Sequence, residues 1–223
     1  MSDIFREVDD ALQQEKVTKL WREYGPTLIL SAVLLVLMTA AVTGYRAWDA
    51  KKDAEETARL TKALESDNAV EQLVEFAKDA RSGQAASALM TAAGLYTDKH
   101  EYTKAAETYK QAFEQSGTPG AFRDLARILY VRALLMTKEK QEGEKLLEVL
   151  QPVLKNGRGP YVWQARLDAA LISDHMLKDP ARSLGYLKDF EKADNIPLSL
   201  KEKAKDLSEL YETNTESKEE KGS

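Results

Sequence analysis

The side chains that most often carry enzymatic chemistry are scarce in this sequence. It contains no cysteine, which excludes a thiolate nucleophile, a cysteine zinc site and a disulfide. The two histidines, His100 and His175, are far apart and belong to no HExxH pair, which favours ordinary surface histidines over metal ligands. No GxSxG elbow, phosphate-binding loop or dinucleotide fingerprint occurs. The sequence therefore predicts a protein without catalytic residues, cofactor or metal.

Carboxylates are plentiful, but they alternate with lysine along segments of helical periodicity, as solvated helix surfaces do. The chain carries 37 Asp and Glu against 32 Lys and Arg, a net charge of −5. A nucleic-acid-binding protein usually shows a clustered excess of basic residues, which is missing here. Proline and glycine are sparse and the composition favours helices. We expect an all-α protein without a nucleic-acid partner.

One segment, residues 24–45, contains no charged side chain. As a helix its 22 residues would extend over about 33 Å, enough to cross a hydrocarbon layer of about 30 Å. Aromatic residues flank the segment where membrane proteins place their interfacial belts: Trp21, Tyr24, Tyr45 and Trp48. A buried core helix and a cleaved signal peptide are the alternatives, but the run is long and six acidic residues precede it. We expect an uncleaved transmembrane helix in contact with the lipid bilayer.

The flanks of this segment are less informative. In the tail, residues 1–23, apolar residues recur at helical spacing from Ile4 to Leu12, which fits either docking on a partner or a simple lead into the membrane helix. Basic residues are almost equally frequent on the two sides, so charge does not assign the orientation. Inside the segment, Ala40 and Gly44 form a small-xxx-small pair that can let two helices approach. Residues 46–66 continue the helical pattern as a stalk.

A tetratricopeptide-like pattern follows in residues 85–115. This repeat joins two antiparallel helices, with small residues where the helices approach and large residues in the gaps. Its consensus, W-x2-L-G-x2-Y followed by A-x3-F and a further small residue, is met with substitutions at these positions: Leu89, Ala92, Ala93, Tyr96, Ala105, Tyr109 and Ala112. We expect helices over 85–97 and 101–115 that pack as a pair.

Less regular helices are expected on both sides of this pair. A helix over 68–80 comes first, with Ser66 or Asp67 as its N-cap and Ser82–Gly83 as its end. The later helices are expected over 121–137, 141–154, 161–177 and 180–191, with 199–211 as a cap on the stack. The small positions that correspond to Ala105 are interpreted as Gly143 and Ser183, at spacings of 38 and 40 residues.

These helices together define the predicted α-solenoid, with a generic helical bundle as the alternative. The repeat domain is expected over 67–212 and a solvated, disordered tail over 213–223. The first helix of each pair would line a concave face with flexible apolar side chains, which suit the binding of unfolded segments. The candidate groove residues are Met90, Thr97, Ile128, Arg132, Leu135, Met136, Ile172, His175 and Met176. Burial of the same residues against neighbouring helices is the alternative.

The order of these parts resembles the YfgM-like family of ancillary SecYEG translocon subunits, which are single-pass inner-membrane proteins with tetratricopeptide-like repeats. The resemblance extends over nearly the whole chain. It is most specific around the membrane segment, where Val17, Trp21 and Gly25 lead in and Tyr45–Trp48 lead out.

The resemblance implies a bacterial inner-membrane anchor with a cytoplasmic N-terminus and a periplasmic helical domain. It also implies association with SecYEG subunits and a membrane-bound periplasmic chaperone, in aid of newly exported proteins, and it supplies no catalytic residues. An interaction module of another envelope system, such as cell division or cell-wall synthesis, would share the repeats and differ in its partners.

Overall fold

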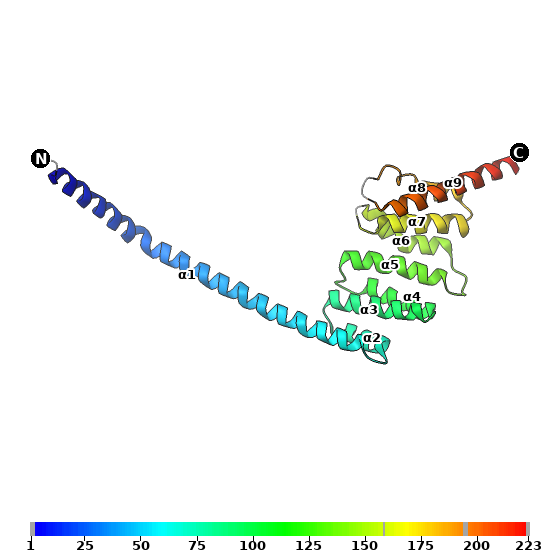
Figure 1. Cartoon of the computed structure of the whole chain (residues 1–223), viewed down its shortest axis with the longest axis horizontal. Coiled ribbons are helices and arrows are strands. Elements are labelled where there is room, and N and C mark those ends of the chain that lie inside the picture. Colours follow the sequence, from blue (N-terminus) through cyan, green and yellow to red (C-terminus); the bar gives the residue numbers. More distant parts are fainter. Residues whose placement is uncertain (1–2, 158, 194–195, 222–223) are drawn as a thin grey trace. The chain divides into compact units, whose positions relative to one another are not determined.

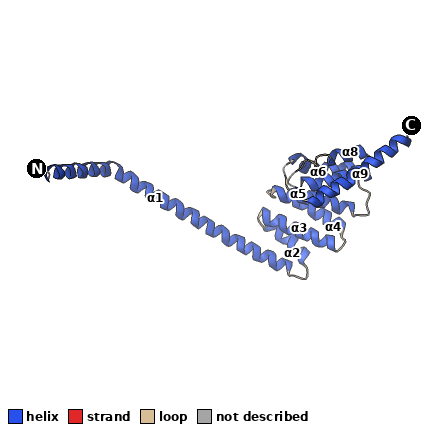
Figure 2. Ribbon diagram, turned by 45° about the horizontal axis from the view of Figure 1, so that its top comes forward, coloured by secondary structure: helices blue, strands red, loops and turns tan. Residues whose placement is uncertain are grey.

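The structure is a computed structural model that describes residues 3–157, 159–193 and 196–221. Within these ranges every regular element is a helix, which confirms the predicted all-α class (Figure 2). The chain divides into two compact units, Met1–Glu55 and Glu56–Ser223. The division lies inside the first helix, α1.

Helix α1, Asp3–Leu64, contains the predicted tail helix, spanning segment and stalk as one helix (Figure 1). Its side chains from Ile29 to Trp48 are exposed. Hydroxyl groups in this stretch donate to carbonyl oxygens four residues earlier in the same helix, from Ser31 to Thr27 at 2.8 Å and from Thr43 to Thr39 at 2.7 Å. The helix therefore satisfies these polar groups by itself, as a segment surrounded by lipid must.

The second unit is a stack of helix pairs (Figure 1). The end of α1 pairs with α2 (Ala69–Asp79). The next pairs are α3 (Ser82–Asp98) with α4 (Tyr102–Glu114), α5 (Gly120–Leu135) with α6 (Gly143–Asn156), and α7 (Val162–His175) with α8 (Pro180–Leu187). Helix α9, Leu198–Lys221, ends the stack.

The stack has an inner and an outer layer. The first helices of successive pairs approach one another with Cα atoms within 8 Å, α3 beside α5, α5 beside α7, and α7 beside α9. For the second helices α4, α6 and α8, all of which lie in the described ranges, no such approach exists. The first helices therefore converge on one side of the stack, while the second helices spread apart on the other.

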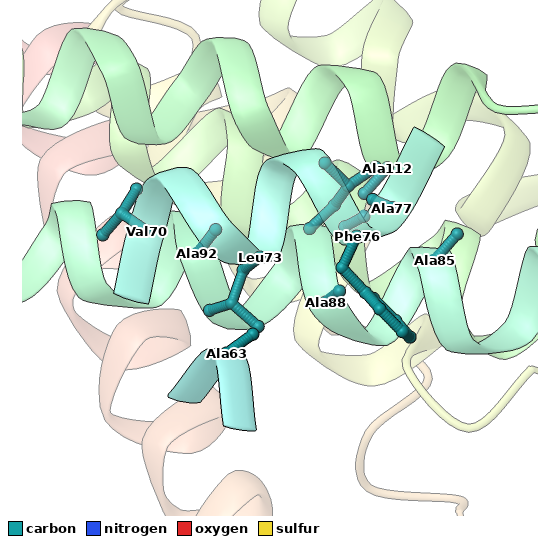
Figure 3. Close-up of a cluster of buried hydrophobic side chains, with 11 residues drawn as sticks. Ala63, Val70, Leu73, Phe76, Ala77, Ala85, Ala88, Ala92 and Ala112 are labelled. Carbon is teal, nitrogen blue, oxygen red and sulfur yellow. The ribbon is translucent and has the colours of Figure 1, made fainter. Parts of the chain in front are cut away.

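The core changes character along the stack. Around α2, α3 and α4 it is built largely from alanine, which lets helix backbones come close together. Figure 3 shows Leu73 and Phe76 of α2 among these alanines, with Ala63 from the end of α1. Around α6 and α7 the buried side chains are mostly larger aliphatic ones, such as Leu147, Leu150 and Ile172.

The repeat domain begins earlier than the predicted residue 67. Ala63 is buried and Leu60 packs against the same cluster. The Arg81 guanidinium also reaches the Glu56 carboxylate, with its Nε 3.3 and 3.2 Å from the two oxygens. The last two turns of the predicted stalk are therefore the first helix of the first pair. The sequence did not indicate this because the helical pattern continues without a break from the membrane segment.

Several predicted helix ends are wrong. Neither Ser66 nor Asp67 caps α2, which begins after Asn68; the Ser66 hydroxyl instead donates to the Ala63 carbonyl at the end of α1, at 2.8 Å. Ser82–Gly83 starts α3 rather than ending the preceding helix. The chain is also helical beyond residue 213, since α9 continues to Lys221 where a disordered tail was expected.

Candidate functional site

The tetratricopeptide-like positions of α3 and α4 lie where the pattern requires them. Ala92, Ala93, Ala105 and Ala112 are fully buried. The large members fill the space around them, with Leu89 and Tyr109 each 5% exposed, and Tyr96 partly buried. The small side chains thus allow two helices to approach, and the large ones occupy the gaps between them.

The later pairs keep this arrangement with different residues. Ala105 and Ser183 are each the fourth residue of their helix, and the fourth residue of α6 is Leu146 rather than Gly143. Gly143 nevertheless marks a close approach, because a Cβ atom there would lie 2.8 Å from Cδ2 of Leu177. The buried Ser183 hydroxyl donates to the Ala170 carbonyl at 2.8 Å, which ties α8 to α7.

The predicted groove residues do not form one surface. Ile128 and Ile172 are each 1% exposed and belong to the hydrophobic core, so their assignment to the groove is wrong. Met90 and Met176 are half-buried and pack against core clusters. The physical reason is that apolar side chains on α5 and α7 face neighbours on more than one side, so burial takes most of them.

Four of the predicted residues remain accessible. Three of these lie together on one helix, and we call them the α5 patch: Arg132, Leu135 and Met136. Leu135 is 42% exposed and Met136 is 58% exposed, at the C-terminal end of α5. Of the remaining candidates, Thr97 donates its hydroxyl to the Ala93 carbonyl, and His175 is exposed with Nδ1 3.0 Å from Asp174 Oδ2. Among the predicted groove residues, the accessible apolar side chains are thus confined to the C-terminal end of α5.

One accessible aromatic residue was missed. Phe122, near the start of α5, is 39% exposed and lies on the same helical face as Arg132 and Met136. The spacing of three and four residues from Phe122 through Leu125 and Leu129 to Arg132 was a signal that could have found it.

An ion pair that the sequence did not indicate connects α5 to α7. The Arg132 guanidinium donates to both oxygens of Asp168, from Nε at 2.9 Å and from Nη2 at 3.2 Å. Asp168 is only 7% exposed, and burial raises the pKa of its carboxyl group, against the opposing effect of Arg132 and of Lys203 on α9. The pair fixes two inner helices to each other and holds Arg132 beside the apolar part of the α5 patch.

Comparison with known proteins assigns the chain to a family. The family described as "tetratricopeptide repeat-like domain" matches residues 18–154, which are more than half of the sequence. This chain belongs to the tetratricopeptide repeat-like domain family. No curated protein and no solved structure matches it. Domains of this family are typically non-catalytic modules for protein interaction, so the match supports protein partners in general and the predicted repeats in particular.

The family match includes the whole membrane segment, residues 24–45. Among the described residues α1 is the helix long and apolar enough to cross a bilayer, by its length and composition, which fits a single-pass membrane protein. Of the predicted interfacial aromatics, Tyr24, Tyr45 and Trp48 are exposed, whereas the side chain of Trp21 lies outside the described residues. The rings of Tyr45 and Trp48 are 6.1 Å apart, and the Lys52 ammonium lies 4.0 Å from the Trp48 ring.

The predicted helix-pairing residues Ala40 and Gly44 are both exposed on α1 of this tetratricopeptide repeat-like protein. A Cβ atom added at Gly44 would meet nothing within 4 Å. This face of the helix is therefore open, and its pairing with another membrane helix stays a prediction.

Proposed function

We propose that this protein is a membrane-tethered, non-catalytic interaction subunit that associates with the SecYEG translocon and assists exported proteins on the periplasmic side. The observation that carries the proposal is the presence in one chain of an exposed, uncharged helical segment and a tetratricopeptide repeat-like domain. The first feature supplies a lipid anchor, and the second supplies surfaces for protein partners. The choice of translocon and of the periplasmic side rests on the sequence resemblance to the YfgM-like family.

Client binding is assigned to the α5 patch. Its exposed Leu135 and Met136 side chains offer flexible apolar contacts, and the neighbouring Arg132 offers hydrogen bonds to backbone carbonyls or carboxylates of an unfolded segment. Such a patch is small, so it favours weak and reversible binding over a permanent complex.

Association with the translocon is tested by crosslinking in intact membranes, followed by detergent extraction and purification of the full-length protein. We expect SecYEG subunits and a membrane-bound chaperone among the crosslinked products. Recovery of division or wall-synthesis enzymes in their place would move the protein to another envelope system. A reporter fused to the C-terminus checks the orientation separately, and a cytoplasmic signal from it would exclude the periplasmic role.

Client binding is tested with the double variant Leu135→Ser/Met136→Ser. Both side chains are exposed, so the fold should be kept while protection of an unfolded client against aggregation is reduced. The matched control is Leu64→Ser, which removes a similarly exposed leucine, 44% accessible, from the end of α1. Equal protection by the parent and the double variant would exclude the α5 patch as the client site.

Pairing inside the membrane is tested with Ala40→Leu/Gly44→Leu, which adds bulk to the small-residue face. Recovery of translocon subunits with this variant should decrease. Ala41→Leu, a neighbouring small-to-large change on another face of the helix, is the control and should leave recovery unchanged. Equal recovery with all three proteins would exclude pairing through Ala40 and Gly44.

A further inference from the structure

A hollow opens in the outer layer of the stack, where the second helices α6 and α8 spread apart over α7. It measures about 250 Å³ and is lined by residues of all three helices. At about 30 Å³ for each water molecule, it has room for a side chain and not for a helix. Gly185 of α8 keeps it open, because a Cβ atom there would meet nothing within 4 Å. We call it the α8 hollow.

The lining of the α8 hollow combines apolar surface with charge. Leu154 of α6 and the Tyr186 ring of α8 supply the apolar surface. Lys155 of α6 and Arg166 of α7 supply positive charge, and Asp189, just after the end of α8, supplies a carboxylate. Apolar walls with a few polar groups are typical of a site that holds part of a ligand.

The Arg166 guanidinium is held in place from two sides. Its Nη1 donates to Asp189 Oδ2 at 2.6 Å, and its central carbon lies 5.1 Å from the centre of the Trp163 ring. Trp163 in turn packs edge-on against Phe190, which is 2% exposed. Among the described residues, no acceptor binds the other nitrogens of this guanidinium. Arg166 therefore offers further N–H groups in a fixed orientation.

The charged groups that line the α8 hollow leave one cation over. The hydrogen bond from Arg166 and the positive charges nearby lower the pKa of Asp189, so that its carboxylate is ionised and paired with Arg166 at neutral pH. Lys155 is exposed and has no ion-pair partner in the described ranges of the chain. The lining therefore carries an excess of one positive charge, on Lys155.

Two lysines and two glutamates just outside the lining balance each other. Lys188 and Lys192 act on the charge of Asp189 from the end of α8. Glu191 lies between these lysines in the sequence, and Lys188 and Glu191 both line the separate hollow between α8 and α9. Glu148 lies two turns before Lys155 on α6, about 10 Å away along the helix axis. The excess of one positive charge at the lining therefore remains.

We infer that the α8 hollow binds the carboxylate side chain of a glutamate or aspartate from an acidic segment of a partner protein. The carboxylate would accept hydrogen bonds from the Lys155 ammonium and from the free N–H groups of Arg166, while its methylene groups contact Leu154 and Tyr186. A single excess cation matches the single charge of a carboxylate better than the double charge of a phosphate monoester. This site lies on the outer layer, so it is separate from the α5 patch and independent of the proposed translocon partner.

Binding is tested with a rhodamine-labelled hexaglutamate peptide and the full-length protein in non-ionic detergent, followed by fluorescence polarisation. We expect saturable binding that Lys155→Gln weakens about tenfold. Lys140→Gln is the matched control, because it removes the same charge from an exposed position in the loop between α5 and α6 and should leave the affinity unchanged. No saturable binding, or equal losses in the two variants, would overturn the inference.

Filling the hollow tests the site without a change of charge. Gly185→Leu places a side chain in the hollow and should weaken peptide binding about tenfold, since the carboxylate then no longer reaches Arg166. Gly185→Ala adds only a Cβ atom, which has room, and should keep the affinity of the parent. Circular dichroism checks that both variants remain folded. Equal affinities of the parent and Gly185→Leu would show that the peptide binds elsewhere and would exclude the α8 hollow.

Competition identifies the class of anion. At equal ionic strength, glutarate should displace the peptide at a lower concentration than inorganic phosphate does, because the hollow presents one excess cation to a planar carboxylate. Displacement by phosphate at the lower concentration would make the α8 hollow a phosphate site and would overturn the assignment to an acidic protein segment.

Discussion

The pair α3/α4 and the pair α5/α6 build the same supersecondary unit from different side chains. In α3/α4, fully buried alanines lie between the two helices, so the two helix backbones come close together along most of their length. In the second, buried leucine and valine side chains such as Leu146, Leu150 and Val153 occupy the interface. The comparison shows that small residues and bulky residues are alternative solutions to the same packing problem, one by proximity and one by filling volume.

The largest effect is expected where volume is removed from the α5/α6 pair. Leu150 on α6 is fully buried, so Leu150→Ala should lower the free energy of unfolding by about 2–5 kcal/mol through a cavity and lost apolar burial. Urea unfolding of the full-length protein in detergent, followed by circular dichroism, measures the change. The same substitution at the half-exposed Leu210 of α9 is the control and should cost less than about 1 kcal/mol. Equal losses would contradict the distinction between core and surface.

The next largest effect is expected where volume is added to the α3/α4 pair. Ala92 is fully buried between close helices, so Ala92→Leu should destabilise the fold by about 1–3 kcal/mol through overpacking. Ala121→Leu makes the same change at an exposed position of α5 and should shift stability by no more than about 0.5 kcal/mol. If Ala92→Leu were tolerated equally well, alanine would not be what sets the distance between α3 and α4.

The Arg132–Asp168 ion pair extends the comparison, because it joins the α5/α6 pair to the α7/α8 pair by charge rather than by packing. Arg132→Leu leaves a buried carboxylate without its main partner and should cost about 1–2 kcal/mol at neutral pH. The loss should shrink as the pH falls. Burial already raises the pKa of Asp168, so the folded variant takes up a proton there more readily than the unfolded chain does.

Unfolding midpoints of the parent protein and Arg132→Leu at pH 7.5 and pH 5 measure this dependence. Arg132→Lys, which keeps the charge and loses the two-pronged geometry, should fall between them. A loss that grows toward acidic pH would mean that Asp168 is not the group left unpaired.

The smallest effect concerns Gly143, a small residue in the α5/α6 pair, whose core is otherwise built from large side chains. A Cβ atom at Gly143 would lie 2.8 Å from Cδ2 of Leu177 and 3.1 Å from Cβ of Met176, so Gly143→Ala should destabilise the protein by up to about 1 kcal/mol. At Gly185 of α8 nothing lies within 4 Å, and Gly185→Ala should stabilise it by about 0.5–1 kcal/mol through helix propensity. Thermal melting compares the two, and a shared sign would mean that helix propensity, and not the close approach, decides at Gly143.

The same contrast explains what the sequence could predict. Alanine at fixed spacing is a local pattern, so the sequence predicts the α3/α4 pair together with its core residues. The uncharged segment of α1 is a local pattern of the same kind. The prediction that Ile128 and Ile172 line the groove is wrong, because both are buried. When a helix has neighbours on several sides, the sequence alone does not indicate which of its apolar residues face solvent. The ion pair between Arg132 and Asp168 joins residues 36 positions apart, and no local pattern indicates such a contact.

The continuation of α9 to Lys221 was not predictable either. A solvated tail and a continued helix look alike in residues 213–221, where charged and polar side chains dominate.

The start of the repeat domain inside α1 has a practical consequence for recombinant work on this protein. A truncated polypeptide that begins at residue 67 loses Leu60 and Ala63, and water then reaches the side of α2 that carries Leu73. It also loses the carboxylate that holds Arg81. A fragment that begins just before Glu56 keeps both, and we expect it to express as a monodisperse product where the shorter one aggregates.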